Sequence, residues 1–440
     1  MRVLIASDYY PPFIGGAHRQ TRLIARELAA RGHDVAVATL WYQGARDEEP
    51  DDGFVVHRVR QVRTILPRLA RAGQQHQPAF PDPLTAAQLR RVIRGFRPDL
   101  VHAYGGIAFS AALALTGLPT PLVVAARDYG LGCPTRTLVF EDQICSGPSV
   151  RKCPSCAMRY YGPAKGLVAT GGLAVGGPLL RRRVAALHSV STYVQTTVRR
   201  DFLRGREVAQ IVVPSFRADS ERVASADDSE IVRRLDEIGG PFILFVGALR
   251  REKGIEELLT AYSALDGPPP LVLMGTVERD TPSVLPAGVV VIEDAAMPDV
   301  LAAWERAAFG VLPSRWPEPL GSVVYEGMSR GKAVIGTKPG GHEDMIVDGE
   351  SGLLVPAGDV GALEDAMRRL LQDSDLRDRL GRAARERSRA FVAATAVPRL
   401  ERFLQEVIGT APRPGGYRGR KETGRSGRKM PASSTTARRL

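Results

Sequence analysis

The sequence predicts an α/β protein built from two doubly wound, Rossmann-like domains that face each other across a cleft. Short apolar runs alternate with amphipathic helical segments along most of the chain, which is typical of parallel sheets covered by helices. This alternation stops at a polar stretch near 215–235 and then starts again. We therefore expect one domain over 1–218 and a second over 219–390.

In the first domain, each apolar run is expected to form a buried parallel strand. The runs are 2–7, 34–40, 100–103, 121–126 and 209–214. Between the first two, Leu23, Ile24 and Leu28 recur at helical spacing, and Gly32 ends the pattern. Residues 16–32 are therefore predicted to form an amphipathic helix with a glycine stop.

The second domain repeats the pattern and is followed by closing helices. Its expected strands are 242–249, 271–276, 289–292, 309–314, 333–336 and 352–356. A helix is expected from near Gly321 to Gly331, and two more follow the last strand. The final one, over 391–410, is expected to pack back on the first domain. Residues 411–440, rich in Arg, Gly and Ser, are expected to form a disordered basic tail.

Composition limits the function classes. With 44% apolar and 25% charged residues, the chain has the composition of a soluble globular protein. The first ten residues contain no secretory signal, and the apolar stretches 105–118 and 166–180 are too short to span a bilayer. We therefore expect a cytoplasmic protein.

The net charge of +12 is unevenly distributed. Residues 1–220 carry 29 Lys and Arg against 16 Asp and Glu, whereas residues 221–410 carry 22 against 31. The basic half is either scattered solvated charge or a face attracted to an acidic acceptor or to an anionic membrane surface, at the inner face of the cell membrane. Such a contact would use 166–183, where a Gly-rich apolar segment meets Arg181, Arg182 and Arg183; a helix buried in the core is the alternative. No nucleic acid partner is expected, because interleaved aromatic residues are lacking.

Ligands of open α/β sheets bind at the carboxyl ends of the strands, and three loops there carry candidate residues. Gly15 and Gly16 open the first helix, where bare backbone N–H groups suit an anion. The loop after 242–249 holds three cations that suit a diphosphate: Arg250, Arg251 and Lys253. The third loop holds Glu318, and Glu326 lies on the helix that follows it.

These motifs together resemble a known family. Glu318 and Glu326, spaced E-x7-E in "EPLGSVVYEG", resemble the signature of the family 4 retaining nucleotide-sugar glycosyltransferases, which have the GT-B fold. The stretches "PPFIGGA", "ARGHDVAV", "VGALRREKG" and "GGHEDMIVDGESGLLVPAGD" agree in order, and the resemblance covers roughly 1–408. It implies sugar transfer from a UDP- or GDP-linked donor to a cell-envelope, polysaccharide or other glycan or lipid-linked acceptor, without a catalytic cofactor.

The resemblance also implies roles for individual residues. Lys253 would contact the diphosphate, Glu326 the nucleotide ribose and Glu318 the hydroxyls of the donor sugar. The backbone amides near Leu320 and Gly321 would approach the phosphates.

The chain departs from the family in three places. One is the stretch "IVVPSFRAD", which replaces the usual Pro-Asn-Gly turn before the linker. Ala248 stands where the family commonly has Arg, and Arg127-Asp128 stands where it often has a His-Asp pair. Arg127 cannot act as a base at neutral pH, so its role would be electrostatic. Arg127 and Asp128 are kept as candidate catalytic residues beside Glu318.

Two other function classes stay open. One is a GT-B enzyme of a different reaction type, such as a nucleotide-sugar 2-epimerase; the other is a non-enzymatic, membrane-associated scaffold that uses the basic tail. The E-x7-E motif and the paired glycines fit the transferase better.

All four cysteines, Cys133, Cys145, Cys153 and Cys156, fall within 24 residues of the acceptor-side domain. The Cys153-Pro-Ser-Cys156 spacing is typical of zinc sites. Because disulfides are disfavoured in a reducing cytoplasm, a structural zinc or iron ion and four free thiols are the main alternatives. We expect the cysteines on a long loop, and a metal there would be structural rather than catalytic.

Overall fold

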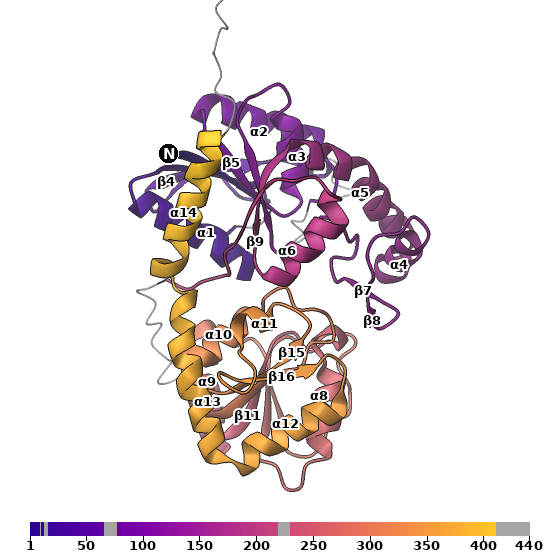
Figure 1. The fold of residues 1–440 in the computed structure, drawn as a ribbon, viewed down its shortest axis with the longest axis vertical. Coiled ribbons are helices and arrows are strands. Elements are labelled where there is room, and N and C mark those ends of the chain that lie inside the picture. Colours follow the sequence, from indigo (N-terminus) through magenta and orange to yellow (C-terminus); the bar gives the residue numbers. More distant parts are fainter. Residues whose placement is uncertain (9, 13–15, 66–76, 219–228, 411–440) are drawn as a thin grey trace, which may run out of the picture.

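A computed structural model confirms the α/β fold, with two sheets in two bodies that lie end to end (Figure 1). It describes residues 1–8, 10–12, 16–65, 77–218 and 229–410. Gly15 and the basic tail after Thr410 therefore lie outside the described residues, and the predictions made for them stay predictions.

The first sheet is built from the apolar runs that the sequence offers, and helices cover both of its faces. The strand order is β10-β9-β6-β5-β1-β2-β4-β3, and all pairs are parallel except β3–β4. Continuous burial along the central strands explains why they read as unbroken apolar runs. The strands are β1 Arg2–Ser7, β2 Asp34–Leu40, β3 Glu48–Asp51, β4 Phe54–Val59, β5 Leu100–Tyr104, β6 Leu122–Ala126, β9 Val184–Ser189 and β10 Ala209–Val212.

Several helices of this domain were not expected, and the predicted cysteine loop ends in a helix. The segment that carries the cysteines forms a short hairpin and then α4, so that Cys153 and Cys156 lie on a helix rather than on a loop. The helix predicted over 16–32 ends at Ala30. The elements are α1 Gly16–Ala30, η1 Val62–Ile65, α2 Pro83–Phe96, α3 Ile107–Ala114, hairpin strands β7 Val139–Phe140 and β8 Gln143–Ile144, α4 Lys152–Tyr161, α5 Pro163–Arg183, α6 Thr192–Val198 and η3 Arg199–Leu203.

The second sheet is wholly parallel, in the order β13-β12-β11-β14-β15-β16. Its strands start and end within a few residues of the predicted runs. They are β11 Phe242–Val246, β12 Leu271–Met274, β13 Val289–Ile292, β14 Ala307–Leu312, β15 Val334–Lys338 and β16 Leu353–Pro356. The helices are α7 Glu230–Glu237, η4 Arg251–Lys253, α8 Ile255–Ser263, α9 Met297–Arg306, α10 Ser322–Ser329, α11 His342–Met345, α12 Val360–Gln372, α13 Ser374–Arg387 and η5 Ser388–Phe391.

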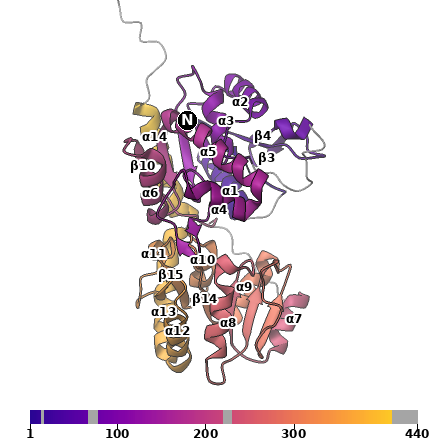
Figure 2. The same cartoon turned by 90° about the vertical axis from the view of Figure 1, so that its right-hand side faces the viewer.

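The last described helix, α14 (Ala393–Thr410), leaves the second domain and lies against the first, as its path along one side of the molecule shows (Figures 1 and 2). Its apolar face, including Val397, Leu400 and Leu404, belongs to the same buried cluster as residues of β1 and α1. Glu401 accepts hydrogen bonds from Arg31 (2.7 Å) and pairs with His33 (2.8 Å). Helix α14 thus completes the core of the first domain, although the whole second domain lies between the two in the sequence.

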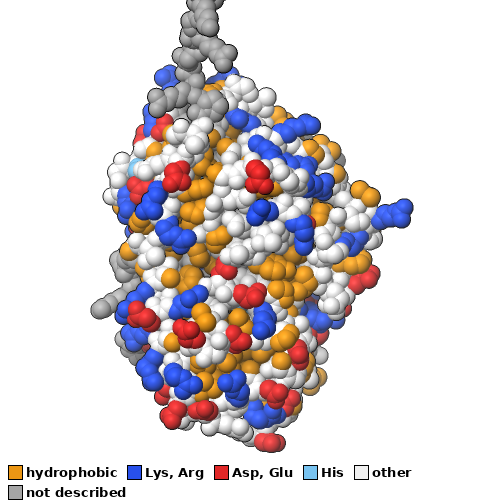
Figure 3. All heavy atoms as spheres, viewed as in Figure 1, with side chains coloured by type: hydrophobic (Ala, Val, Ile, Leu, Met, Phe, Trp, Pro, Cys, Tyr) orange, Lys and Arg blue, Asp and Glu red, His pale blue; other side chains and the backbone are white. Residues whose placement is uncertain are grey.

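Charge is distributed as the sequence indicates. Lys and Arg predominate on the visible face of the first domain, whereas both signs are interspersed over the second (Figure 3). None of the helices in the described part of the chain combines the length and the apolar character needed to cross a bilayer.

Candidate active site between the domains

The candidate site is a cleft of about 510 Å³ to which both domains contribute. Its second-domain wall is formed by the turn after β14 and by α10. Its first-domain wall comes from α1, the end of β6 and the segment after β10. The residues that line it include Arg19, Gln20, Arg22, Arg26, Arg127, Asp128, Ser215, Phe216, Trp316, Glu318, Leu320, Gly321, Glu326 and Arg330.

Glu318 lies in the turn that connects β14 to α10, and only 8% of the residue is exposed. One oxygen, Oε2, accepts hydrogen bonds from Lys253 Nζ (2.7 Å), Trp316 Nε1 (2.8 Å) and Ser314 Oγ (3.1 Å). Burial raises the pKa of Glu318, but the charge of Lys253 and these donors outweigh it, so the pKa lies below its usual value. Glu318 is therefore an ionised, firmly oriented acceptor.

Glycine residues make this turn possible. Gly321 has φ of +77°, a left-handed conformation that favours glycine, and a Cβ there would lie 2.7 Å from His342 Nε2. From the other side Gly341 N donates to the Glu318 carbonyl at 2.6 Å. The "GGH" stretch before α11 thus packs directly beneath the Glu318 turn and holds it in place.

Glu326 lies one turn and a half into α10 and is also buried, with 7% exposed. Burial raises its pKa to about 7, and the positive charges of Arg19 and Arg330 oppose that shift only partly. The two glutamates therefore line one cleft in different states. Glu318 is ionised and bonded within the protein, whereas the raised pKa of Glu326 favours its protonated form more than in a solvated glutamate.

The three cations after β11 do not all reach the cleft. Lys253 bonds Glu318, but Arg250 lies 3.6 Å from Glu278 and Arg251 lies 3.3 Å from Asp142 of the β7–β8 hairpin. Neither Arg250 nor Arg251 is among the residues that line the cleft. Their predicted contact with a diphosphate stays a prediction, and it would need these ion pairs to rearrange.

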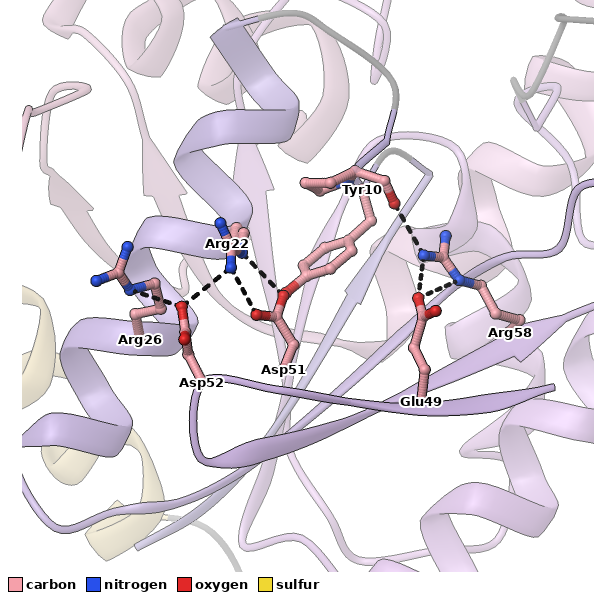
Figure 4. Close-up of polar contacts among 8 residues, drawn as sticks. Tyr10, Arg22, Arg26, Glu49, Asp51, Asp52 and Arg58 are labelled. Atoms are coloured by element: carbon pink, nitrogen blue, oxygen red, sulfur yellow. Dashed lines mark hydrogen bonds and ion pairs between the residues drawn. The ribbon is translucent and has the colours of Figure 1, made fainter. Parts of the chain in front are cut away.

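The first-domain wall carries a row of arginines on one face of α1: Arg19, Arg22 and Arg26. Figure 4 shows how the β3–β4 hairpin holds two of them. Arg22 makes a bidentate pair with Asp51 (2.7 and 2.8 Å), and Arg26 lies 3.1 Å from Asp52. Tyr10 also donates to Asp51 at 2.6 Å. The hairpin thus fixes the arginine side chains at the rim and neutralises part of their charge.

Arg127 and Asp128 follow β6 and reach the same cleft from the opposite side to Glu318. Burial lowers the pKa of Arg127, yet a guanidinium remains charged at neutral pH. Arg127 Nη2 donates to Ser215 Oγ. Next to Asp128, Tyr129 crosses to the second domain, where its hydroxyl donates to the Pro317 carbonyl at 2.7 Å.

The structure therefore brings Arg127, Asp128, Leu320, Gly321, Glu318 and Glu326 to one cleft, with Lys253 bonded to Glu318 and Gly16 as the first residue of α1. Sequence reasoning missed Gln20, Ser215, Trp316 and Tyr129. Trp316 stands two residues before Glu318 and could have been found by proximity. Gln20 and Ser215 have no such signal, because each reaches the cleft only through the fold.

The four cysteines are free thiols that lie part-buried around the hairpin and the start of α4. Burial and the neighbouring thiols raise the pKa of both Cys153 and Cys156. Among the residues that the structure describes, no three or more His, Cys, Asp or Glu side chains are grouped so as to hold a metal ion. Zinc or iron binding stays a prediction, and it would require the thiols to turn toward one centre.

Comparison with known proteins identifies the family. The model for "Glycosyl transferases group 1" matches residues 228–387, and that for "Glycosyl transferase 4-like domain" matches residues 15–214. The chain belongs to the group 1 glycosyltransferases. This glycosyltransferase is 29% identical over 416 residues to a 2-deoxystreptamine N-acetyl-D-glucosaminyltransferase of Streptomyces fradiae. The alignment covers 90% of this chain and 89% of the relative. It is 25% identical over 417 residues to a glycogen synthase of Mycobacterium tuberculosis, with 88% and 90% covered.

Solved structures support the fold of this glycosyltransferase. Sucrose-phosphate synthase from Thermosynechococcus elongatus superposes with a TM-score of 0.67 at 19% identity, over 93% of this chain and 99% of that one. The Anabaena protein HepE, in complex with UDP-glucose, superposes with a TM-score of 0.64 at 17% identity, over 92% and 99%. The two-domain architecture is therefore that of the GT-B glycosyltransferases, and the enzyme transfers a sugar from a nucleotide sugar.

The geometry of the cleft suits this chemistry. Breaking a glycosyl–phosphate bond creates positive charge on the sugar and negative charge on the leaving diphosphate, so a site needs oriented acceptors for the one and oriented cations for the other. In this glycosyltransferase, the buried Glu318 supplies a fixed acceptor, and the first-domain wall supplies the cations Arg19, Arg22, Arg26 and Arg127. Because water is largely excluded at such depth, these charges act more strongly than they would at the surface.

Proposed function

We propose that this glycosyltransferase moves a hexose, with retention of configuration, from a UDP- or GDP-linked donor to a cell-envelope or other polysaccharide acceptor that is presented at an anionic membrane surface. The comparisons support both nucleotide types. HepE is seen with UDP-glucose, and a relative from Mycobacterium tuberculosis, 26% identical over 397 residues, is a GDP-mannose-dependent α-mannosyltransferase.

The observation that carries the donor proposal is the placement of Glu318 and Glu326 in one cleft, on either side of the first turn of α10. A buried carboxylate is costly unless a cation or a ligand compensates it. Lys253 does so for Glu318, whereas the charges of Arg19 and Arg330 do so only partly for Glu326. A nucleotide sugar offers hydroxyl donors at two separate places, the ribose and the sugar ring. Glu326 is proposed to accept from the first and Glu318 from the second.

A panel of nucleotide sugars tests this proposal. UDP-, GDP- and ADP-linked hexoses and N-acetylhexosamines are each titrated into the wild-type enzyme by calorimetry, and slow hydrolysis is followed by release of the nucleotide. We expect one base to be preferred and the matching sugar to be hydrolysed without acceptor. Absence of both binding and hydrolysis across the UDP and GDP members would refute the proposed donor class.

The membrane part of the proposal rests on the α4–α5 hairpin and the segments around it. No Asp or Glu occurs between residues 143 and 200, although that stretch carries nine Lys and Arg. Several of its apolar side chains are exposed: Val150 (93%), Val175 (75%), Leu167 (56%) and Val168 (54%). Exposed apolar side chains among cations, without acids, suit the interface of an anionic bilayer. The alternative that this segment is a helix buried in the core applies to only part of α5. Gly176 and Leu180 are buried, whereas Leu167, Val168 and Val175 are exposed.

The structure refines which arginines could make this contact. Arg183 donates to the carbonyls of Leu115 and Thr120, both at 3.1 Å, and so supports the end of α3. Arg181 and Arg182 are the better candidates. We expect an Arg181→Ser, Arg182→Ser, Val175→Ser variant to sediment less with liposomes rich in phosphatidylglycerol at low salt. The matched control is Arg91→Ser with Arg94→Ser, two exposed arginines on α2. Equal binding of both variants, or binding that salt leaves unchanged, would refute the surface.

A further inference from the structure

Two buried N–H groups of the first-domain wall have no hydrogen-bond partner among the described residues: Arg127 Nη1 and Gln20 Nε2. Gln20 is only 4% exposed, and both residues line the cleft. A buried donor without an acceptor costs free energy that a folded protein ordinarily avoids. Two of them at one cleft point to a ligand that supplies the acceptors.

The two side chains that carry these groups are each bonded to one of two consecutive residues. Arg127 Nη2 donates to Ser215 Oγ, and the backbone N–H of Phe216 donates to Gln20 Oε1 at 3.0 Å. Because Oε1 accepts from a backbone N–H, the orientation of the amide is fixed and Nε2 is its free end. The segment after β10 thus anchors an arginine and a glutamine whose sequence positions are more than a hundred residues apart.

No carboxylate of the protein is bonded to Arg127 in the described structure. The neighbouring Asp128 is turned to other groups, since Oδ1 accepts from Gly130 N at 2.7 Å and Oδ2 lies 3.7 Å from Arg136. The groups behind Arg127 carry no negative charge either. His102 and His188 are buried and bonded to each other at 3.2 Å, and burial, with Arg127 nearby, lowers the pKa of both so that they stay neutral.

We propose that Arg127 and Gln20 form an oxyanion subsite on the first-domain wall, and that it binds a phosphoryl group. The pair offers N–H donors only, which matches a group that only accepts; a hydroxyl would also need an acceptor for its proton. A guanidinium is well matched to phosphoryl oxygens. This inference rests on the proposed function, because the phosphoryl group belongs either to the donor diphosphate or to the acceptor.

Two variants remove the subsite in different ways. Gln20→Glu keeps Oε1 as the acceptor for Phe216 N but replaces the free N–H2 end by an oxygen, so it repels an anion at nearly unchanged volume. Arg127→Gln removes the charge, and Arg127→Lys restores charge without the second donor. The matched control is Arg90→Gln, which removes an α2 guanidinium that donates to the Ala114 and Thr116 carbonyls. Thermal unfolding confirms that each variant is folded before ligands are added.

The probes are the nucleoside diphosphate preferred by the wild type, its matched nucleoside, and inorganic phosphate, each titrated by calorimetry. If the donor supplies the phosphoryl group, Gln20→Glu and Arg127→Gln should lose about tenfold or more in diphosphate affinity, with the nucleoside unchanged and Arg127→Lys in between. If the acceptor supplies it, diphosphate affinity is unchanged, but the nucleotide-saturated wild type binds inorganic phosphate and the two variants do not.

Two results would overturn the proposed subsite. One is that the Gln20 and Arg127 variants bind all three probes with the affinity of the Arg90→Gln control. The other is that their affinity for the nucleoside falls as much as their affinity for the diphosphate. A wild type that binds none of the nucleotides would instead refute the proposed donor class. In that case inorganic phosphate, titrated into the wild type and the variants without nucleotide, still decides whether the subsite exists.

Discussion

Glu318 and Glu326 are buried to the same degree but differ in what surrounds them. Glu318 has a lysine at 2.7 Å and two neutral donors on one oxygen, whereas Glu326 has only the more distant charges of Arg19 and Arg330 to oppose its burial. The same residue type therefore has a lowered pKa at one position and a raised pKa at the other.

This difference predicts how pH changes stability. Because the pKa of Glu326 rises from 4.5 to about 7 on folding, the native state binds more protons than the unfolded state between these values, and stability falls as pH rises through that window. Glu326→Gln removes this effect. As pH rises from 4.5 to 7, we expect the unfolding free energy of the variant to increase relative to that of the wild type, by up to about 3 kcal/mol in total. Above about pH 7 the difference between the two proteins should stay constant.

Urea unfolding of both proteins at several pH values measures this difference. Glu318→Gln is the informative comparison. Since the pKa of Glu318 is lowered on folding, its carboxylate stabilises the fold above its unfolded pKa, and this contribution is lost as pH falls. The Glu318 variant should therefore be less stable than the wild type at neutral pH. A Glu326→Gln difference that does not vary with pH would contradict the prediction.

The two residues should also separate in ligand binding. Glu326→Ala is expected to weaken free nucleoside diphosphate binding, since the ribose is present in the free nucleotide. Glu318→Ala is expected to slow transfer more than it weakens nucleotide binding, since its ligand is the sugar. Calorimetry with UDP or GDP, together with turnover, checks this. Equal losses of nucleotide affinity in both variants would contradict the division.

Among the site residues, the sequence predicts those that lie in one short stretch and misses those that only the fold brings together. Glu318, Leu320, Gly321 and Glu326 are close in sequence, so one motif points to all of them. Ser215 is bonded to Arg127 across 88 positions, and Phe216 to Gln20 across 196. No local pattern encodes such contacts, because they depend on how β6, β10 and α1 are arranged.

Helix α14 shows what a single element contributes. Leu400 is fully buried against the first domain, so Leu400→Ala should lower the unfolding free energy by about 2–5 kcal/mol. Gln405→Ala, an exposed position of the same helix, should change it by no more than about 0.5 kcal/mol. Denaturant unfolding measures both. A Leu400 variant as stable as the Gln405 control would show that α14 does not complete the core.

The cysteine segment yields a prediction about metal content. If the zinc-like spacing at the start of α4 reflects a structural site, protein purified without a metal-binding tag should contain about one equivalent of zinc or iron by elemental analysis. Cys153→Ser should reduce that content and lower the melting temperature. A metal content below about a tenth of an equivalent in folded protein would end the prediction.

At the scale of elements, the central strands could be predicted because burial on both faces gives long apolar runs. β4 and β9 were missed for identifiable reasons. β4 (Phe54–Val59) includes His57 and Arg58, and β9 follows α5 directly, with Arg183 and Val184 adjacent. Helix α4 was missed because glycine, proline and cysteine around 147–156 indicate a loop by composition.

For the whole molecule, the chain passes between the domains twice, and the two passages meet. Arg217 N donates to the Phe391 carbonyl at 3.1 Å, and Ala393 N donates to the Arg217 carbonyl at 2.9 Å. The segment leaving the first domain and the segment returning to it are therefore joined by backbone hydrogen bonds, beside Ser215 and Phe216, which anchor Arg127 and Gln20.

We expect such a paired crossing to act as a hinge. Two parallel connections that are bonded to each other resist sliding and twisting, so the easiest relative motion is rotation about an axis through the bonded pair. Ser215 and Phe216, which hold Arg127 and Gln20, stand within two residues of the bonded pair at Arg217, so we expect a rotation there to displace these two side chains little. A phosphoryl group bound by Arg127 and Gln20 would then stay in place while the second domain rotated toward the sugar and away from it.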